Sequence, residues 1–201
     1  MDHAQPDRVV YTIGHSTHPM EVFVGLLNRA GITAVADVRS TPYSRWQPQY
    51  NREALRSTLA DRGVAYVFLG AELGGRGDGD SPRDGDGRIM YRRLAESPAF
   101  REGVRRVLKG MVSRRVALMC TEADPLRCHR GILIARELTE ADVRVAHIHG
   151  DGRLEGHGDA ERRLLRLAGL AGPDLLRDER ETLADAYGHQ ESRIAHVLSR
   201  G

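Results

Sequence analysis

The stretch VALMCTEADPLRCHRGILIAREL, residues 116–138, has the pattern that decides the fold. Its first five residues are continuously apolar, which is typical of a strand buried on both faces of a sheet. Asp124 and Pro125 then resemble a helix start, with a capping side chain followed by proline in the first turn. The apolar residues of 126–138 predict a helix. A buried strand followed directly by a helix is the repeating unit of an α/β fold.

The same unit recurs on both sides of this stretch. Strands are predicted at residues 9–13, 33–38, 65–69, 116–120 and 143–148, and helices at residues 20–30, 52–62, 98–112 and 126–138. Continuous apolar strands separated by helices indicate a parallel sheet covered on both faces. We therefore predict a three-layer α/β domain over residues 1–152, with a mostly parallel, five-stranded, Rossmann-like sheet. Residues 153–201 predict a helical C-terminal extension packed on or beside it.

Composition limits the class of protein. The chain has 201 residues, a length that predicts one domain. Thirty basic and 28 acidic residues give a net charge of +2, which excludes a general basic coat for nucleic acid but allows a local basic patch. Two cysteines exclude a scaffold built from disulfides. Because we find no signal-peptide pattern and no apolar run long enough to span a bilayer, we expect a cytoplasmic protein without a membrane partner.

Reactive side chains gather where the predicted strands end. His15 and Ser16 follow the first strand, Asp37 and Arg39 end the second, and Cys120 and Glu122 end the fourth. Ligands of an open parallel sheet bind outside the carboxyl ends of its strands. We therefore expect several of these side chains to meet Cys128 in one cleft. The candidate catalytic residues, a thiol and three groups that can carry protons, are Cys128, Glu122, Asp37 and His15.

Cys128 is the candidate nucleophile of this set. It lies near a predicted helix start beside Arg127, His129 and Arg130, and positive charge there lowers the pKa of a thiol. A thiolate is both a nucleophile and a metal ligand. Cys120, in contrast, is expected to be a small buried apolar residue at a strand end.

The loop RSTPYSRWQPQYNR, residues 39–52, carries three arginines and three aromatic residues but no carboxylate. Arginine binds phosphate with two parallel hydrogen bonds, and aromatic faces stack on bases. The loop therefore indicates a phosphate-bearing ligand, such as a nucleotide or a nucleic-acid component. The predicted substrate-binding residues are Arg39, Arg45, Ser16, Tyr43, Trp46, His129 and Arg130.

A metal site is an alternative use of the same residues. Cys120, Cys128, His129, His15 and His147 are donors of the types that zinc and iron accept. None of them forms a CxxC or HxxxH pair, so only the fold could gather them. We therefore assign no metal ligand, and the sequence identifies no cofactor.

Residues 74–88, GGRGDGDSPRDGDGR, contain six glycines and four aspartates. Such a segment has nothing to bury and predicts a mobile loop. Because it follows the third strand, it would lie at the same edge of the sheet as the candidate site and could act as a lid.

Five motifs occur in order along the chain: TIGHS (12–16), DVRSTPYSR (37–45), LGG (73–75), CTEADPLRCHR (120–130) and HIHGDG (147–152). Their combination resembles the domain of unknown function 488 family over roughly residues 9–152. The resemblance implies a compact α/β domain and supports the choice of site residues. Because the family has no assigned activity, the resemblance implies no reaction.

The sequence therefore predicts a small enzyme, a hydrolase or a transferase, whose cleft binds a phosphate-bearing ligand. Two alternatives from other classes remain open. One is a non-catalytic nucleic-acid-binding or sensing module, and the other is a metal-binding redox sensor that uses both cysteines.

Overall fold

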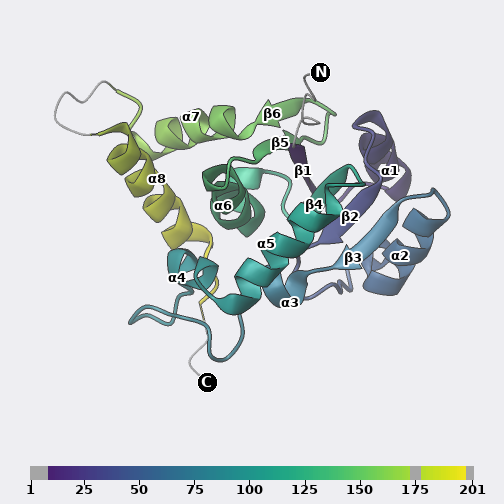
Figure 1. Ribbon diagram of the computed structural model, residues 1–201, viewed down its shortest axis with the longest axis horizontal. Coiled ribbons are helices and arrows are strands. Elements are labelled where there is room, and N and C mark those ends of the chain that lie inside the picture. The colour runs from purple at the N-terminus through teal and green to yellow at the C-terminus, as the bar shows by residue number, and fades with distance from the viewer. Residues whose placement is uncertain (1–8, 173–177, 198–201) are drawn as a thin grey trace, which may run out of the picture.

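The computed structural model describes residues 9–172 and 178–197, and within them six strands form one sheet (Figure 1). The strands are β1 (Val9–Gly14), β2 (Ala34–Asp37), β3 (Ala65–Phe68), β4 (Val116–Cys120), β5 (Arg144–Ile148) and β6 (Leu154–Gly156). Their order is β3-β2-β4-β1-β5-β6, with β1 to β5 parallel and β6 antiparallel to β5. The predicted α/β class and mostly parallel sheet are confirmed. The sheet has six strands rather than five, because β6 is too short to give an apolar pattern.

Eight α-helices lie within the described residues. They are α1 (Met20–Arg29), α2 (Arg52–Ala60), α3 (Gly70–Leu73), α4 (Tyr91–Ala95), α5 (Pro98–Gly110), α6 (Arg136–Glu140), α7 (His157–Ala168) and α8 (Glu179–Ile194). Two 3₁₀ turns (Pro48–Tyr50 and Pro125–Arg127) and a π-helical segment (Arg130–Ala135) accompany them. Within the described ranges, no helix is long and apolar enough to cross a membrane.

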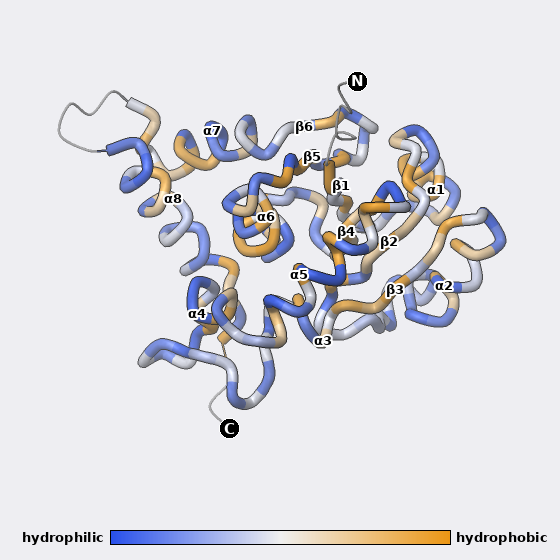
Figure 2. The backbone as a smooth tube through the Cα atoms, viewed as in Figure 1, coloured by the Kyte–Doolittle hydropathy of each residue, from blue (hydrophilic) through white to orange (hydrophobic). Residues whose placement is uncertain are grey.

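The sheet is buried on both faces because successive strand residues point in opposite directions. Tyr11 and Ile13 of β1 pack into a cluster with α1 and α2. Val10 of β1 and Leu118 of β4 belong to a second cluster with α4 to α8. Figure 1 shows these two groups of helices on either side of the sheet, and Figure 2 shows apolar residues along the central strands. The predicted three-layer arrangement follows from this alternation.

The helix predicted at residues 126–138 begins later than expected. A 3₁₀ turn comes first, and Cys128 is then extended, with φ −143° and ψ 142°. The π-helical segment starts at Arg130 and continues into α6. Gly131 packs so closely that a Cβ there would lie 2.2 Å from the Pro125 carbonyl oxygen. Cys128 therefore lies outside the regular helix, although the predicted helix at residues 126–138 included it, and tight packing of this loop accompanies the later start.

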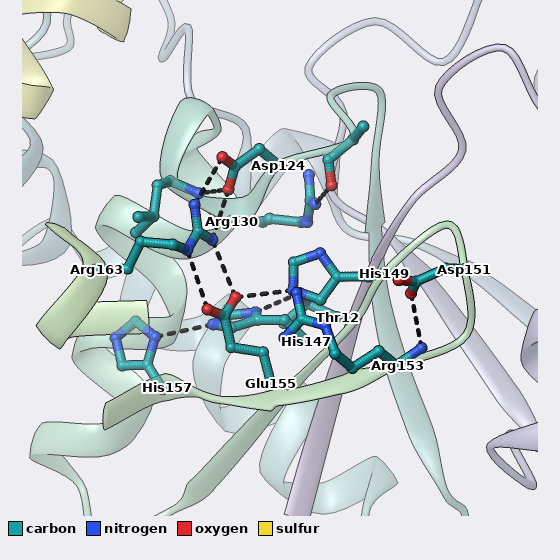
Figure 3. Close-up of polar contacts among 12 residues, drawn as sticks. Thr12, Asp124, Arg130, His147, His149, Asp151, Arg153, Glu155, His157 and Arg163 are labelled. Atoms are coloured by element: carbon teal, nitrogen blue, oxygen red, sulfur yellow. Dashed lines mark hydrogen bonds and ion pairs between the residues drawn. The ribbon is translucent and has the colours of Figure 1, made fainter. Parts of the chain in front are cut away.

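A chain of largely buried hydrogen bonds joins the sheet to the C-terminal helices, and Figure 3 shows its first part, from Thr12 through His147 to His157. It runs from Thr12 to His147 (2.8 Å), to His157 (3.0 Å), to Tyr187 (2.9 Å) and on to Glu161 (2.9 Å). Because the Tyr187 hydroxyl donates to Glu161, its oxygen accepts from His157 Nε2, and each preceding group donates onward in turn. Both histidines are therefore neutral in this chain. His147 is fully used here and lies outside the group of metal donors described below.

Arg163 of α7 makes a second connection, to the loop that follows β4. Its guanidinium donates to both carboxylate oxygens of Asp124, at 2.8 and 2.9 Å, and to both of Glu155, at 3.0 Å each (Figure 3). Asp124 in turn accepts from the Leu126 amide at 3.0 Å, as expected of the predicted capping residue. Arg163, in the C-terminal part of the chain, thus fixes Asp124 at the start of the 3₁₀ turn Pro125–Arg127.

The loop at residues 74–88 has local turn structure and little buried surface. Ser81 donates to Asp78 (2.8 Å), Asp84 accepts from the Arg88 amide (2.8 Å), and Arg88 bridges to Val197 near the C-terminal end. Beyond Gly75 its residues are exposed or half-buried, and Figure 2 shows the segment mostly in hydrophilic colours. The loop has no large apolar side chain to bury, but Gly74 and Gly75 are buried and residues 81–84 and 87–88 are half-buried, and its mobility remains a prediction.

Replacing residues 77–87 with a short Gly-Ser linker should change the melting temperature by less than about 4 °C. The reason is that a surface segment of this kind contributes no more than about 1 kcal/mol in a chain of this size. Differential scanning calorimetry measures the change. A loss of several kcal/mol would contradict the assignment of this loop as peripheral to the core.

The stability of the fold should decrease in acid because of its buried histidines. Burial lowers the pKa of His157 from 6.5 to about 4, and burial also lowers the pKa of His147. Between pH 6.5 and 4 the unfolded chain binds protons that the folded chain excludes. As the pH is lowered through this window, the free energy of unfolding should therefore decrease, by up to about 1.4 kcal/mol per pH unit for each histidine.

Urea unfolding at pH 7 and pH 5 measures this dependence. His157→Gln should reduce the difference between the two pH values, whereas His189→Gln, at an exposed position of α8, should leave it unchanged. Equal pH dependence in all three proteins would show that the buried histidine chain does not control acid stability.

Candidate functional site

A polar cavity of about 250 Å³ opens at the carboxyl edge of the sheet, beyond the ends of β2 and β4. Its lining comes from five segments of the chain, at residues 39–41, 75–76, 91, 120–129 and 194–196. The lining residues are Arg39, Ser40, Thr41, Gly75, Arg76, Tyr91, Cys120, Thr121, Glu122, Arg127, Cys128, His129, Ile194 and His196. This is the edge at which the sequence predicted a site.

The loops after the strands continue the pairing of the sheet and so bring these residues together. The His15 amide donates to the Cys120 carbonyl at 2.9 Å, and the Val38 amide donates to the Met119 carbonyl at 3.0 Å. Gly14 lies so close to the next loop that a Cβ there would be 1.9 Å from the Glu122 carbonyl oxygen. Any side chain at this position would displace the loop that carries the cavity residues.

Cys120, Cys128 and His129 lie together at the cavity and form what we call the dithiol–histidine cluster. The Nδ1 atom of His129 is 3.8 Å from the Cys120 sulfur and 3.7 Å from the Cys128 sulfur. The Cys120 sulfur lies 3.2 Å from Glu122 Oε2, so its single proton can be donated either to this carboxylate or to the Cys128 sulfur. All three residues of the cluster are buried, with exposed fractions of 4%, 2% and 9%. Cys120, expected to be only a small apolar residue, is part of this polar cluster.

The His129 ring is held in one orientation. Its Nε2 atom lies 3.0 Å from the Val38 carbonyl oxygen and donates to it. In the neutral ring Nδ1 then carries a lone pair that faces the two sulfur atoms. Gly75 makes room for the ring, since a Cβ at that position would lie 2.5 Å from His129 Cγ. The LGG motif thus contributes to the cluster without contributing a side chain.

The two thiols differ in acidity. The hydrogen bond to Cys128, together with burial, raises the pKa of Cys120 well above its ordinary value. Burial also acts to raise the pKa of Cys128, but the hydrogen bond from Cys120 and the charges of Arg130 and His129 lower it well below that of a free thiol. The arrangement favours a Cys128 thiolate beside a protonated Cys120.

His129 and Glu122 adjust to this thiolate. Burial acts to lower the pKa of His129, but the adjacent Cys128 sulfur outweighs burial and raises it. Burial raises the pKa of Glu122, and Cys128 raises it further. Glu122 therefore takes up a proton more readily than an ordinary glutamate and can carry one within the cavity.

Arg130 supports the cluster from behind and does not line the cavity, although the sequence placed it among the substrate-binding residues. Its side chain is completely buried. The guanidinium donates to the Glu122 carbonyl at 2.5 Å and to the Ala123 carbonyl at 2.8 Å. These bonds fold the loop after β4 around the guanidinium, which accounts for its position.

Arg39 lines the cavity, and the predicted proton carriers Asp37 and His15 lie behind it. Arg39 Nε and Nη2 donate to the two oxygens of Asp37 at 2.9 and 2.7 Å, and Tyr66 donates to the same carboxylate at 2.8 Å. The remaining Arg39 nitrogen, Nη1, donates to His15 Nε2 at 3.3 Å. Burial and the Arg39 charge lower the pKa of His15 to about 4, so His15 is neutral near pH 7. Asp37 and His15 thus position Arg39.

Four other predicted substrate-binding residues lie outside the cavity lining. Tyr43 and Trp46 are 67% and 76% exposed, and the Arg45 guanidinium lies 4.6 Å from the centroid of the Trp46 ring. Ser16, with φ 47°, donates through its amide to the Thr121 carbonyl at 2.8 Å. The structure brings together Arg39, Glu122, Cys128 and His129 of the predicted set. The sequence interpretation missed several lining residues, among them Arg76, Tyr91, Arg127 and His196.

The CTEADPLRCHR motif held a signal for one of these residues. Arg127 adjoins Cys128, and the sequence interpretation used its charge only to explain the acidity of the thiol. His196 gave no signal, because it lies 67 positions beyond His129 in a segment that carries no motif. Only the folding of the C-terminal segment back to the cavity reveals it.

Comparison with family models matches residues 19–136 to "Domain of unknown function DUF488". This match covers more than half of the chain. The chain belongs to this family. Comparison with curated proteins and comparison with solved structures each find no match. The family membership agrees with the resemblance of the motifs and adds no reaction, so the site has to be interpreted from its geometry.

The difference between the two thiols predicts selective alkylation. In metal-free protein near pH 7, iodoacetamide should label Cys128 before Cys120, because only a thiolate attacks the reagent rapidly. Peptide mass spectrometry follows each site. Cys128→Ser should remove the fast phase, whereas Cys120→Ser should retain it, since a serine hydroxyl can also donate to the Cys128 sulfur. Labelling of Cys120 first, or of both residues at one rate, would contradict this assignment.

Proposed function

We propose that this protein is an enzyme that binds the phosphate-bearing part of a small molecule, such as a nucleotide or a nucleic-acid component. The ligand would occupy the cavity at the carboxyl edge of the sheet. The chemistry, a hydrolysis or a group transfer, would take place at the dithiol–histidine cluster with Glu122 beside it. The observation that carries the proposal is that three arginines, Arg39, Arg76 and Arg127, line the same small cavity as this cluster.

Arg39 is prepared to hold an anion. Its guanidinium is 4% exposed, and the bonds to Asp37 leave it one orientation. A side chain fixed in this way loses little conformational freedom when it binds a ligand. The Asp37 pairing neutralises part of its charge, so a second cation is needed for a phosphate group.

Arg76 and Arg127 can supply that charge. Both are exposed, and among the described residues no ion pair engages either guanidinium. Arginine forks match the geometry of phosphate oxygens. A volume of about 250 Å³ is below the range of about 300–1,000 Å³ that whole ligands occupy. We therefore assign the cavity to the phosphate group and the reacting atoms, with the remainder of the ligand across the rim.

Glu122 is the group best placed to move a proton at the reacting centre. It lines the cavity, and its carboxylate is 3.2 Å from the Cys120 sulfur. Cys128 has the role of nucleophile if its thiolate is free, or of ligand if the cluster holds a metal ion. Both roles place the reaction at the same position, and both require the arginines to hold the substrate there.

A second candidate is supported by the loop outside the cavity. Trp46 is 76% exposed and stacks against Arg45, and Tyr43 is 67% exposed nearby in sequence. Exposed aromatic rings and arginines of this kind stack on the bases of single-stranded nucleic acid. A nucleic-acid-binding module without chemistry would use this loop. Its binding would depend steeply on salt, and Trp46→Ala would weaken it.

Arg127→Ala should weaken the binding of a phosphate-bearing probe by about 10- to 100-fold, because a charge-assisted hydrogen bond contributes about 1.5–3 kcal/mol. Isothermal titration calorimetry with a panel of nucleoside monophosphates and with inorganic phosphate measures the loss. Arg101→Ala, at an exposed position of α5, is the matched control. Arg45→Ala should also bind normally, since Arg45 does not line the cavity.

Two results would reject the proposed function. One is that no member of the panel binds to the wild-type protein. The other is that a bound probe is unaffected by Arg127→Ala while Arg45→Ala and Trp46→Ala release it, which would favour the nucleic-acid module.

A further inference from the structure

We infer that Cys120, Cys128 and His129 bind one zinc ion, with a fourth coordination position that faces the arginine-lined cavity. The inference deepens the proposed function, because it uses the same cavity, and it assigns both sulfur atoms as ligands in the loaded protein. Cys128 is then a metal ligand rather than the attacking group.

The spacing of the donor atoms supports the site. The two sulfur atoms and one nitrogen of His129 all lie within 4.8 Å of one another. Zinc–sulfur and zinc–nitrogen bonds of about 2.3 and 2.05 Å at tetrahedral angles separate sulfur from nitrogen by about 3.5 Å. The sulfur–nitrogen distances here are 3.8 and 3.7 Å. Shifts of a few tenths of an ångström would therefore bring both sulfur–nitrogen distances to those of a tetrahedral site, and the two sulfur atoms, within 4.8 Å of each other, would settle about 3.8 Å apart on binding.

The orientation of His129 supports the same conclusion. A histidine that binds a metal through one ring nitrogen usually donates the other N–H to a carboxylate or a backbone carbonyl. His129 does so through Nε2, which donates to the Val38 carbonyl at 3.0 Å. Its Nδ1 lone pair then faces the space that the two sulfur atoms share. The Arg130 amide, 3.5 Å from the Cys128 sulfur, donates to that sulfur.

The donor types select the metal and the kind of site. Two thiolates and an imidazole suit zinc, whereas magnesium and calcium prefer oxygen ligands. Three protein ligands leave a fourth position for water or substrate, which is the arrangement of catalytic rather than structural zinc. Here that position faces the cavity lined by Arg39 and Arg127, with Glu122 beside it. In this site Cys120 and Cys128 are therefore both metal ligands.

Cobalt substitution tests the site in the full-length wild-type protein. Protein stripped with a chelator under reducing conditions should bind one equivalent of Co²⁺. The spectrum should show a thiolate-to-cobalt charge-transfer band and the strong visible bands of tetrahedral coordination. One equivalent of Zn²⁺ should remove both sets of bands and should protect both cysteines from iodoacetamide. These readouts need no variant, so they do not depend on the folding of a mutant.

Variants then identify the ligands. Cys120→Ser, Cys128→Ser and His129→Gln should each weaken zinc binding by more than about 100-fold, since even the loss of a residue that supports a ligand costs about 10- to 100-fold. His189→Gln is the matched control, and circular dichroism shows whether each variant is folded. Competition with a chromophoric chelator measures the affinity.

Several outcomes would overturn the inference. They are the absence of stoichiometric Co²⁺ binding, a cobalt spectrum without a sulfur band, and free alkylation of both thiols in excess Zn²⁺. If phosphate probes still bind in an Arg127-dependent manner, such a result removes the metal site and leaves the proposed function intact. Zinc binding without any phosphate binding would reject the proposed function and leave the metal site intact.

Discussion

The buried guanidinium of Arg130 is the constraint on which the candidate site depends. A charged side chain without exposure is tolerated only where strong acceptors surround it, and here the acceptors are the carbonyls of Glu122 and Ala123. The loop after β4 must therefore wrap around Arg130. That wrapping returns Cys128 to the side of Cys120, eight positions earlier in the chain, and leaves the Glu122 side chain on the cavity. Removing the guanidinium would release the loop and separate the donors.

Arg39 shows how a second buried arginine is used differently. Its charge is paired with Asp37 at 2.7 Å, and Tyr66 and the Tyr50 carbonyl complete the surroundings of the pair. The loop backbone wraps around Arg130, whereas Arg39 is bonded to Asp37 and His15 and also lines the cavity. Two strand-end loops thus use the same type of side chain, one to shape the site and the other to provide charge within it.

The sequence predicted the fold well because its strands are continuously apolar, and it predicted the site edge because that edge follows from parallel topology. It could not predict β6, whose three residues pair with β5 without an apolar pattern. It misplaced Arg45 because a basic, aromatic loop looks the same whether it faces the cavity or the solvent. It undervalued Cys120, since a cysteine that ends an apolar strand is indistinguishable from a core residue until Cys128 and His129 are beside it.

The C-terminal extension completes a site whose motifs lie elsewhere. The family match ends at residue 136, yet Ile194 and His196 line the cavity. Gln190 of α8 donates to the Leu126 carbonyl at 2.7 Å, and Glu191 accepts from the Tyr91 amide at 2.7 Å. Both bonds come from residues outside the matched region. One stabilises the turn before Cys128, and the other holds Tyr91, which lines the cavity. The matched region supplies the reactive groups, and the extension sets the shape of the space above them.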